Sequence, residues 1–266
     1  MNLAICSLAS GSSGNCYLIK SNKAAILADA GISGRQISLR LGALGLGTDC
    51  INAVVVTHEH SDHTMGLSVL AKSEGVKFFL SEGTEREITE LHGKENVRAF
   101  STGESFDIED IRVNTFHLSH DAADPAGYSF VSGGKKISIV TDTGIVTDEI
   151  FNAVKDSDIL VLESNHDVSM LKIGPYPWFL KQRILSDHGH LSNDAAAEVL
   201  MRIAAEEKGA IKQRQILLAH LSRENNFPEM ALATVDNILE AEGLVPGKEF
   251  LVSALSREES GPLCFV

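Results

Sequence analysis

The sequence predicts an α/β protein in which mixed β-sheets are flanked by helices. The chain has 266 residues, of which 44% are hydrophobic and 22% charged, and this suits one large domain. Short apolar, β-branched runs alternate with amphipathic segments, which is typical of helices packed on sheets. Two apparent hairpins, one turning at Glu109-Asp110 and one at Gly133-Gly134, argue against a purely parallel sheet.

The first half of the chain predicts strands separated at first by turns and later by helices. Ser/Gly-rich turns divide the first three strands, and residues 34–45 combine helical spacing of apolar residues with terminal glycines. The short valine-rich run that follows is fully apolar, as a buried strand requires. The predicted strands cover residues 3–10, 15–21, 24–30, 52–58, 76–81 and 105–120, and the predicted helices cover 34–45, 66–75 and 82–93.

The second half continues this alternation. It opens with the hairpin over residues 127–142, and Ser192 and Asn193 are candidate N-caps of its longest helix. The predicted helices cover 147–156, 192–209 and 228–243, and the predicted strands cover 158–164, 215–222 and 249–256. We find no internal repeat, low-complexity tract or linker, so we expect a single domain over residues 1–266.

Composition excludes several classes of protein. A net charge of −13 argues against a broad nucleic-acid-binding surface, although it allows a local basic strip. It also fits a site in which carboxylates surround metal ions. No run of 18 apolar residues predicts a membrane span, and no basic leader precedes an apolar stretch, so we expect neither a membrane anchor nor a signal peptide.

The four cysteines are scattered and form no CxxC motif. They are Cys6, Cys16, Cys50 and Cys264. We expect small buried hydrophobic residues in a reduced compartment, rather than disulfides or metal ligands.

The stretch "VVVTHEHSDHTMGL", residues 54–67, carries the strongest chemical signal. Four potential ligands follow a strand within six residues, and three more candidates recur at later strand ends: His58, His60, Asp62 and His63, then His120, Asp142 and His220. Imidazole and carboxylate suit Zn²⁺, Mn²⁺ or Fe²⁺. A single histidine is more often a surface or hydrogen-bonded residue, and we assign no such role to His92, His117 or His166. The full pattern predicts a metal site.

The stretch "THEHSDHTMGL" resembles the signature motif of the metallo-β-lactamase superfamily, and "LADAG", "LSHDAADPAGY", "TDTG" and "LLAHLS" match further positions of that family. The resemblance implies a four-layer αββα sandwich with a dinuclear metal centre. It implies that one metal is held by His58, His60 and His120, the second by Asp62, His63 and His220, with Asp142 bridging the two. Asp29 would orient a ligand histidine. The alternative for Asp29 is a turn-forming role before Gly31.

Further stretches resemble the phosphodiesterase branch of this superfamily. "SDHGHLSN" is similar to a segment of tRNase Z-like nucleases, which implies that His190 protonates the leaving oxygen and that Glu163 supports it. Together with "SLASGSSGNCYLI" and "HLSRENN", it resembles the YycJ/WalJ-type members, which are cytoplasmic bacterial 5′→3′ DNA exonucleases. Only about 25 residues separate Glu163 from His190, so we expect no inserted β-CASP domain.

Three stretches supply candidate substrate contacts. Small residues near the N-terminus could approach a phosphate, although such a turn is usually a plain hairpin. Residues 170–184 mix aromatic residues with cations, as nucleic-acid-binding segments do, although a packed loop is the alternative. The candidates are Ser12, Ser13 and Asn15, then Lys172, Lys181 and Arg183, and finally Arg223 and Asn225.

The sequence therefore predicts a hydrolase that acts on phosphodiesters, with a DNA substrate and a cytoplasmic location. A hydroxide shared by two metals, with Asp62 among the ligands that hold it, would attack phosphorus while His190 acts as the acid. Two alternatives stay open. An acyl hydrolase, such as a thioesterase or lactonase, would use the same metal site, and a metal-stabilised regulatory or scaffold protein would use it without catalysis.

Overall fold

The structure, a computed structural model, describes residues 3–73, 75–207 and 212–266. It divides into two compact units. The first comprises Met1–His117, Ala122–Ile137 and Ser256–Val266, and the second comprises Leu118–Asp121 and Ser138–Leu255. That residues 1–266 form one domain stays a prediction.

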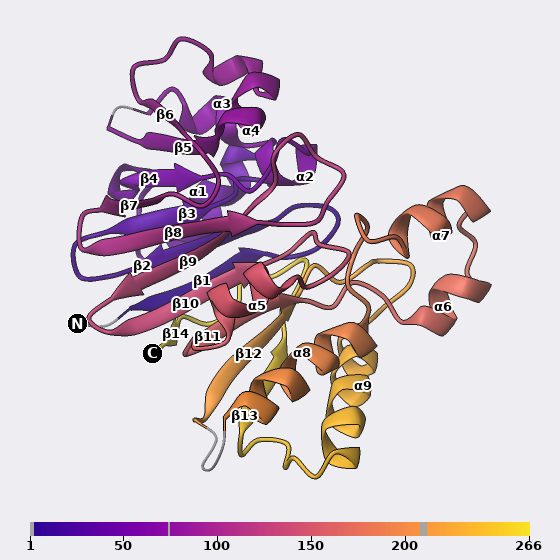
Figure 1. Cartoon of the computed structure of the whole chain (residues 1–266). Helices are drawn as coiled ribbons and strands as arrows, with labels where there is room; N and C mark the ends of the chain where they lie inside the picture. Colours follow the sequence, from indigo (N-terminus) through magenta and orange to yellow (C-terminus); the bar gives the residue numbers. More distant parts are fainter. Residues whose placement is uncertain (1–2, 74, 208–211) are drawn as a thin grey trace. The chain divides into compact units, whose positions relative to one another are not determined.

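The first unit contains a seven-stranded sheet with the order β14-β1-β2-β3-β4-β5-β6 (Figure 1). Its β1, β2 and β3 are antiparallel, whereas β3 to β6 run parallel. The strands are β1 Ala4–Ala9, β2 Cys16–Lys20, β3 Ala25–Ala28, β4 Ala53–Val55, β5 Lys77–Ser81, β6 Val97–Phe100 and β14 Cys264–Phe265. The parallel part matters for function because the carboxyl ends of β3 and β4 meet at one edge.

A second layer of strands lies against this sheet within the same unit. It comprises the antiparallel strands β7 (Ser105–Ile108), β8 (Ile111–His117) and β9 (Ala126–Ser132). The rings of Phe79 on β5 and Phe106 on β7 stack with centroids 4.6 Å apart. The Tyr128 hydroxyl on β9 donates a 2.6 Å hydrogen bond to the carbonyl of Val56, which follows β4. These contacts make a β-sandwich with an aromatic interior.

The helices of the first unit are short, and serine side chains cap two of them. Ser33 caps α1 (Gly34–Ala43) and Ser81 caps α4 (Glu82–Glu87). Two predicted helices were too long. Of residues 66–75, only α3 (Leu67–Leu70) is helical among those described, and residue 74 lies outside them. The predicted helix 82–93 breaks at Ile88, whose ψ of 80° is not helical, and resumes as the 3₁₀ turn Thr89–Leu91. The remaining elements are α2 Ser61–Thr64 and the 3₁₀ turn Thr48–Cys50.

The second unit is built around the parallel strands β11 (Ile159–Glu163), β12 (Arg214–Ala219) and β13 (Phe250–Ala254). They belong to the sheet β13-β12-β11-β10-β9-β8-β7, whose β10 (Lys135–Val140) runs from one unit into the other. The helices are α5 Asp148–Val154, α6 Val168–Ile173, α7 Trp178–Ile184, α8 Asn193–Glu206 and α9 Pro228–Ala241. The last two lie side by side, in orange and yellow in Figure 1.

The predicted architecture of mixed sheets with flanking helices is confirmed. Ser192 caps α8 as predicted, and residues 208–209 of that predicted helix lie outside the described residues. Both hairpins turn where expected. The short elements that were not predicted include β6, β14, α6 and α7. Their two to seven residues are too few to show a periodic pattern.

All four cysteines are free thiols, as predicted. Cys6 and Cys16 are buried in β1 and β2, and burial raises the pKa of the Cys6 thiol to about 11. The expectation of burial was wrong for Cys50, which is exposed at the end of the 3₁₀ turn Thr48–Cys50. Among the helices that the structure describes, none has the length and apolar character that crossing a membrane would need.

Candidate active site

The first unit places a cluster of histidines and carboxylates at the ends of β3 and β4. Asp29 follows β3, and its backbone N–H donates to the carbonyl of Val55 at the end of β4 (2.9 Å). The backbone N–H of Thr57 in turn donates to Asp29 Oδ1 (2.8 Å). Parallel pairing of the two strands therefore brings Asp29 beside the segment that holds the HxHxDH motif.

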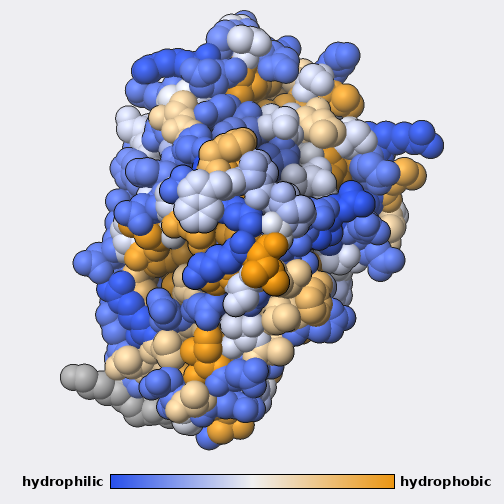
Figure 2. Space-filling model, turned by 90° about the vertical axis from the view of Figure 1, so that its right-hand side faces the viewer, coloured by the Kyte–Doolittle hydropathy of each residue, from blue (hydrophilic) through white to orange (hydrophobic). Residues whose placement is uncertain are grey.

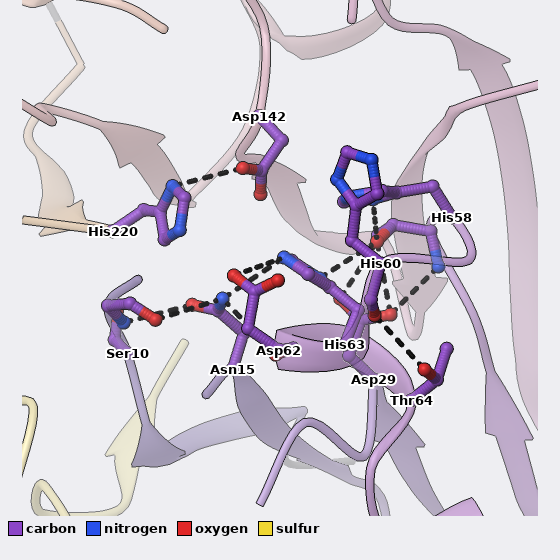
Figure 3. A network of polar contacts seen from close by, with 12 residues as sticks. Ser10, Asn15, Asp29, His58, His60, Asp62, His63, Thr64, Asp142 and His220 are labelled. Atoms are coloured by element: carbon purple, nitrogen blue, oxygen red, sulfur yellow. Dashed lines mark hydrogen bonds and ion pairs between the residues drawn. The ribbon is translucent and has the colours of Figure 1, made fainter. Parts of the chain in front are cut away.

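Asp29 orients His63. The carboxylate Oδ2 lies 2.8 Å from His63 Nδ1, and both side chains are fully buried (Figure 3). This contact assigns the ring proton to Nδ1 and leaves a lone pair on Nε2. His63 Nε2 lies 3.1 Å from Asn15 Nδ2, which can donate to it, and 3.5 Å from Asp62 Oδ2, which cannot. An imidazole lone pair facing a carboxylate oxygen is an arrangement that a cation would stabilise.

The other motif residues lie on the loop after β4 and on the first turn of α2. His60 is the N-cap residue of α2, and its Nδ1 lies 3.0 Å from His58 Nε2. The carbonyl of Asp62 accepts from the backbone N–H of Asn15 (2.8 Å). At Gly31 an added Cβ would lie 1.6 Å from that carbonyl, so only glycine fits there. The motif thus curls at a strand end rather than continuing as a strand.

The second unit holds further potential ligands around Glu163, the last residue of β11. Glu163 Oε1 accepts from Nδ1 of His190 (2.8 Å) and from Nδ1 of His220 (2.9 Å). Oε2 accepts from the backbone N–H groups of Thr143 (2.9 Å) and Leu191 (3.3 Å). Four donors therefore hold one fully buried carboxylate, and β11 pairs Glu163 directly with the residue before His220.

The ionised form of Glu163 is favoured by these donors. Burial by itself raises the pKa of this carboxyl, but the charge of His190 and the hydrogen bonds from His190 and His220 outweigh it, so the pKa is lowered. Asp142, after β10, places Oδ1 3.1 Å from His220 Nδ1 and 3.5 Å from His190 Nδ1. Two histidines and two carboxylates are thus brought together, as a metal or acid–base site requires.

His120 completes the second cluster. Its Nδ1 lies 3.1 Å from the carbonyl of Gly189, so Nδ1 carries the proton. Burial lowers the pKa of His120, although neighbouring carboxylates oppose this, and the ring is neutral. Its Nε2 then presents a lone pair 3.3 Å from Asp121 Oδ1 and 4.0 Å from Asp142 Oδ1. As at His63, a ring nitrogen lone pair faces carboxylate oxygens. Nitrogen and oxygen ligands of this kind fit a divalent cation.

Three residues of these clusters adopt a left-handed backbone conformation. The φ angles of Asp29, Asp142 and His220 are 61°, 62° and 55°, and only one other non-glycine residue among those described, Glu109, has a positive φ in a turn. Such conformations are unfavourable for residues other than glycine, and they are found mostly where function requires them. Each marks a strand end where the chain turns sharply and directs its side chain.

The predicted substrate contacts are placed in different surroundings. Ser12 and Ser13 are exposed in the turn after β1. Lys172, on α6, and Arg223, after β12, are also exposed. Asn15 and Asn225 are buried, and Asn15 supports Asp62 and His63 as described. The Lys181 ammonium donates to the carbonyls of Lys172 and Gly174, and Arg183 forms an ion pair with Asp121. A substrate role for these eight residues stays a prediction.

Sequence reasoning missed three residues that position the clusters. The Thr57 hydroxyl contacts the Asp29 carboxylate and Nδ1 of both His58 and His63. The backbone of Thr143 donates to Glu163 and that of Gly189 accepts from His120. Thr57 stands directly before the motif, which is a usable signal, whereas backbone contacts leave no signal in side-chain type.

Comparisons with known proteins show the family of the chain. A family model described as "Beta-lactamase superfamily domain" matches residues 24–211. The exodeoxyribonuclease YycJ of Bacillus anthracis is 38% identical over 253 residues, which cover 94% of each chain. The exodeoxyribonuclease WalJ of Streptococcus pneumoniae (strain D39) is 39% identical over 261 residues, covering 96% of this chain and 95% of WalJ.

A solved structure supports the fold. The metallo-β-lactamase fold protein YhfI from Bacillus subtilis superposes with a TM-score of 0.73 over the full length of both chains, at 14% identity. The expected αββα sandwich is thereby confirmed. The chain belongs to the β-lactamase superfamily, and it is a hydrolase of that superfamily related to YycJ and WalJ.

Proposed function

We propose that this protein is a metal-dependent phosphodiesterase that digests DNA in the 5′→3′ direction in the cytoplasm. Its relatives YycJ and WalJ carry the name exodeoxyribonuclease. The observation that carries the proposal is the pair formed by His190 and the buried Glu163, joined at 2.8 Å. Hydrolysis of a thioester expels a thiolate, which needs no comparable acid, whereas cleavage of a phosphodiester expels an alkoxide that does.

We further propose that two divalent ions, Zn²⁺, Mn²⁺ or Fe²⁺, bind the clustered side chains, with Asp142 shared between them. The proposed ligands are His58, His60 and His120 for one ion and Asp62, His63 and His220 for the other. The chemistry of this donor set supports the proposal, since Nδ1 of His63 and of His120 is held by an acceptor and Nε2 of each ring faces a carboxylate oxygen. Bound ions of this kind act as Lewis acids toward phosphoryl oxygens and lower the pKa of water.

The side chains of the protein itself orient the ligands and supply the proton. Glu163 holds the Nδ1 proton of His190, which fixes the orientation of the ring. The second ring nitrogen, Nε2, then carries the proton that passes to the departing 3′-oxygen, and the product keeps a 5′-phosphate. Asp29 and Thr57 hold His63 in place.

The test is digestion of single-stranded DNA labelled at either end, with Mn²⁺, Zn²⁺ or EDTA. We expect metal-dependent loss that starts at the 5′ end. His190→Ala should bind metal normally and cleave roughly 10²- to 10⁴-fold more slowly. His188→Ala is the matched control, because His188 is exposed in the same loop and contacts Ser119 rather than Glu163.

Other outcomes would redirect the proposal. Unchanged turnover in His190→Ala would remove this residue from the mechanism. Digestion that starts at the 3′ end would contradict the proposed 5′→3′ direction and leave the rest of the proposal in place. If no metal supports cleavage of DNA or of bis-p-nitrophenyl phosphate, while thioesters or lactones are hydrolysed, the protein is an acyl hydrolase.

A further inference from the structure

Three asparagines are buried in the second unit, next to the chain that follows β11. The face of the molecule on which α6 and α7 lie mixes hydrophilic and hydrophobic residues (Figure 2). Asn165, Asn193 and Asn226, in contrast, are at most 4% exposed, and we call them the asparagine cluster. Because an amide buried without hydrogen bonds destabilises a folded protein, the partners of these side chains show what the cluster holds together.

Two members of the cluster bond to each other and to the first residue after β11. Asn226 Nδ2 donates to Asn193 Oδ1 (2.8 Å) and to the carbonyl of Ser164 (2.8 Å). The Ser164 hydroxyl donates to the same Asn193 Oδ1 (2.6 Å). Asn193 is the first residue of α8, and Asn226 lies two residues before α9. These side chains therefore fasten the starts of two helices to the chain that leaves β11.

Asn165 differs because its amide contacts a residue of the candidate active site. Its Nδ2 donates to the carbonyl of His220 (2.9 Å). Its backbone N–H donates to the carbonyl of Leu191 (2.8 Å), and its own carbonyl accepts from the N–H of Ser222 (2.8 Å). One residue thus holds the chain next to His190 on one side and the chain at His220 on the other.

The backbone of His220 has to be held by other parts of the chain. Its φ is 55°, in the left-handed region that residues other than glycine rarely adopt. The parallel ladder between β11 and β12 ends one residue earlier, at the pair formed by Glu163 and Ala219. The hydrogen bond from Asn165 therefore fixes the peptide group after His220, where the ladder no longer does so.

The backbone of His220 in turn sets the direction of its ring. Nδ1 lies 2.9 Å from Glu163 Oε1 and 3.1 Å from Asp142 Oδ1, and Figure 3 shows the ring beside Asp142. A rotation of the backbone at His220 would move the ring away from both carboxylates. The amide of Asn165 acts on these two distances without touching the ring itself.

We propose that Asn165 is a positioning residue that holds His220 in its left-handed conformation and so keeps the ring in the metal site. The proposal rests on the proposed function, which makes His220 a ligand of one of the two ions. Asparagine suits this position because its amide donates, whereas an aspartate of the same shape would place an oxygen against the His220 carbonyl. Loss of the amide should weaken binding of the ion assigned to His220 and spare the other ion.

Equilibrium dialysis of the full-length protein against Mn²⁺, with metal analysis, tests this. The wild type should bind two ions, and in Asn165→Ala the affinity for one of them should fall about 10- to 100-fold. Asn165→Asp keeps the shape of the side chain and should weaken the same ion at least as much. His220→Ala removes the proposed ligand itself and is the reference for complete loss.

Asn193→Ala is the matched control for a structural effect. It removes an equally buried amide of the same cluster, whose side chain bonds to Ser164 and Asn226. Urea unfolding in EDTA should show a loss of stability in both Asn193→Ala and Asn165→Ala. Only Asn165→Ala should alter Mn²⁺ affinity and the visible absorption of the Co²⁺-loaded protein, which reports the geometry of the ligands.

The outcomes separate this inference from the proposed function. If His220→Ala loses one ion while Asn165→Ala keeps both affinities and the Co²⁺ absorption unchanged, the positioning role is overturned alone. An equal loss of affinity in Asn193→Ala would also overturn it, because Asn165 would then support the fold only. A wild type that binds two ions but digests no DNA would reject the proposed phosphodiesterase, whatever Asn165→Ala shows.

Discussion

Individual residues in this protein take backbone conformations that their side chains do not favour by themselves. Asp29, Asp142 and His220 all have positive φ angles. Asp29 and His220 directly follow a strand, and one residue separates Asp142 from the end of β10. The cost of each is about 1–3 kcal/mol. At Asp29, the backbone N–H donates to the carbonyl of Val55 on the neighbouring strand and so holds the residue in place. Strain of this kind places side chains where regular strands could not.

Asp29→Asn tests orientation at this scale. Asparagine tolerates the left-handed conformation, so the backbone should be kept, but its amide cannot supply the carboxylate charge that holds the His63 Nδ1 proton. We expect metal affinity to fall about 10- to 100-fold, measured by equilibrium dialysis with metal analysis. Asp49→Asn, at an exposed position in the same unit, is the control. Unaltered affinity in Asp29→Asn would leave Asp29 with a turn-forming role only.

At the scale of elements, buried charge fixes the start of β12. Arg214 is buried, and its guanidinium donates to the carbonyls of Ser157 (3.0 Å) and Lys212 (3.2 Å) and to the Glu207 carboxylate. The hydrogen bond from Arg214 lowers the pKa of Glu207, against a smaller opposing effect of burial. The pair thus links the segment after α8 to the strand that precedes His220.

Glu207→Gln should destabilise the protein in a pH-dependent way. Because the folded-state pKa of Glu207 is lowered, its stabilising effect is present above the unfolded pKa of about 4.3 and is lost as pH falls through the folded value. We expect a loss of at most roughly 1.5 kcal/mol at pH 7, since the Glu207 side chain is 27% exposed.

Urea unfolding of both proteins between pH 3 and pH 7 measures this difference. Glu206→Gln is the matched control, because Glu206 forms an exposed ion pair with Lys155. If the difference in the free energy of unfolding between Glu207→Gln and the wild type grows as the pH falls, the lowered pKa of Glu207 is contradicted.

At the scale of the molecule, carboxylates and histidines are concentrated at strand ends in both units. In both, an imidazole lone pair faces carboxylate oxygen: His63 faces Asp62 and His120 faces Asp121. The excess of 13 negative charges over the chain adds to the attraction for cations. A ligand that binds only the folded protein stabilises it by mass action.

Removal of metal should therefore lower the melting temperature. At a free Mn²⁺ or Zn²⁺ concentration 100 times the dissociation constant, the gain is about 2.7 kcal/mol, which corresponds to roughly 5–10 °C for a chain of this size. Differential scanning fluorimetry with metal or with EDTA measures it, and NaCl at equal ionic strength controls for screening. In Asp142→Asn the shift should be smaller. An equal shift in that variant would exclude Asp142 as a ligand.

The sequence by itself determined the family, the order of most elements and the residues of the clusters. Strand periodicity and the spacing of HxHxDH are local properties, and they are readable because they depend on neighbours along the chain. The fold prediction was confirmed, whereas the assignment of ligands, acid and substrate contacts stays a prediction.

The tertiary structure decided what each side chain faces. Lys181 is buried beneath a turn and Asn225 is buried in a loop, while Trp178 and Phe179 are exposed. Nothing in local spacing separates these cases, because burial depends on segments distant in sequence. The same holds for His190 and Glu163: a motif names them, but only the packing of α7 and β11 sets their 2.8 Å contact.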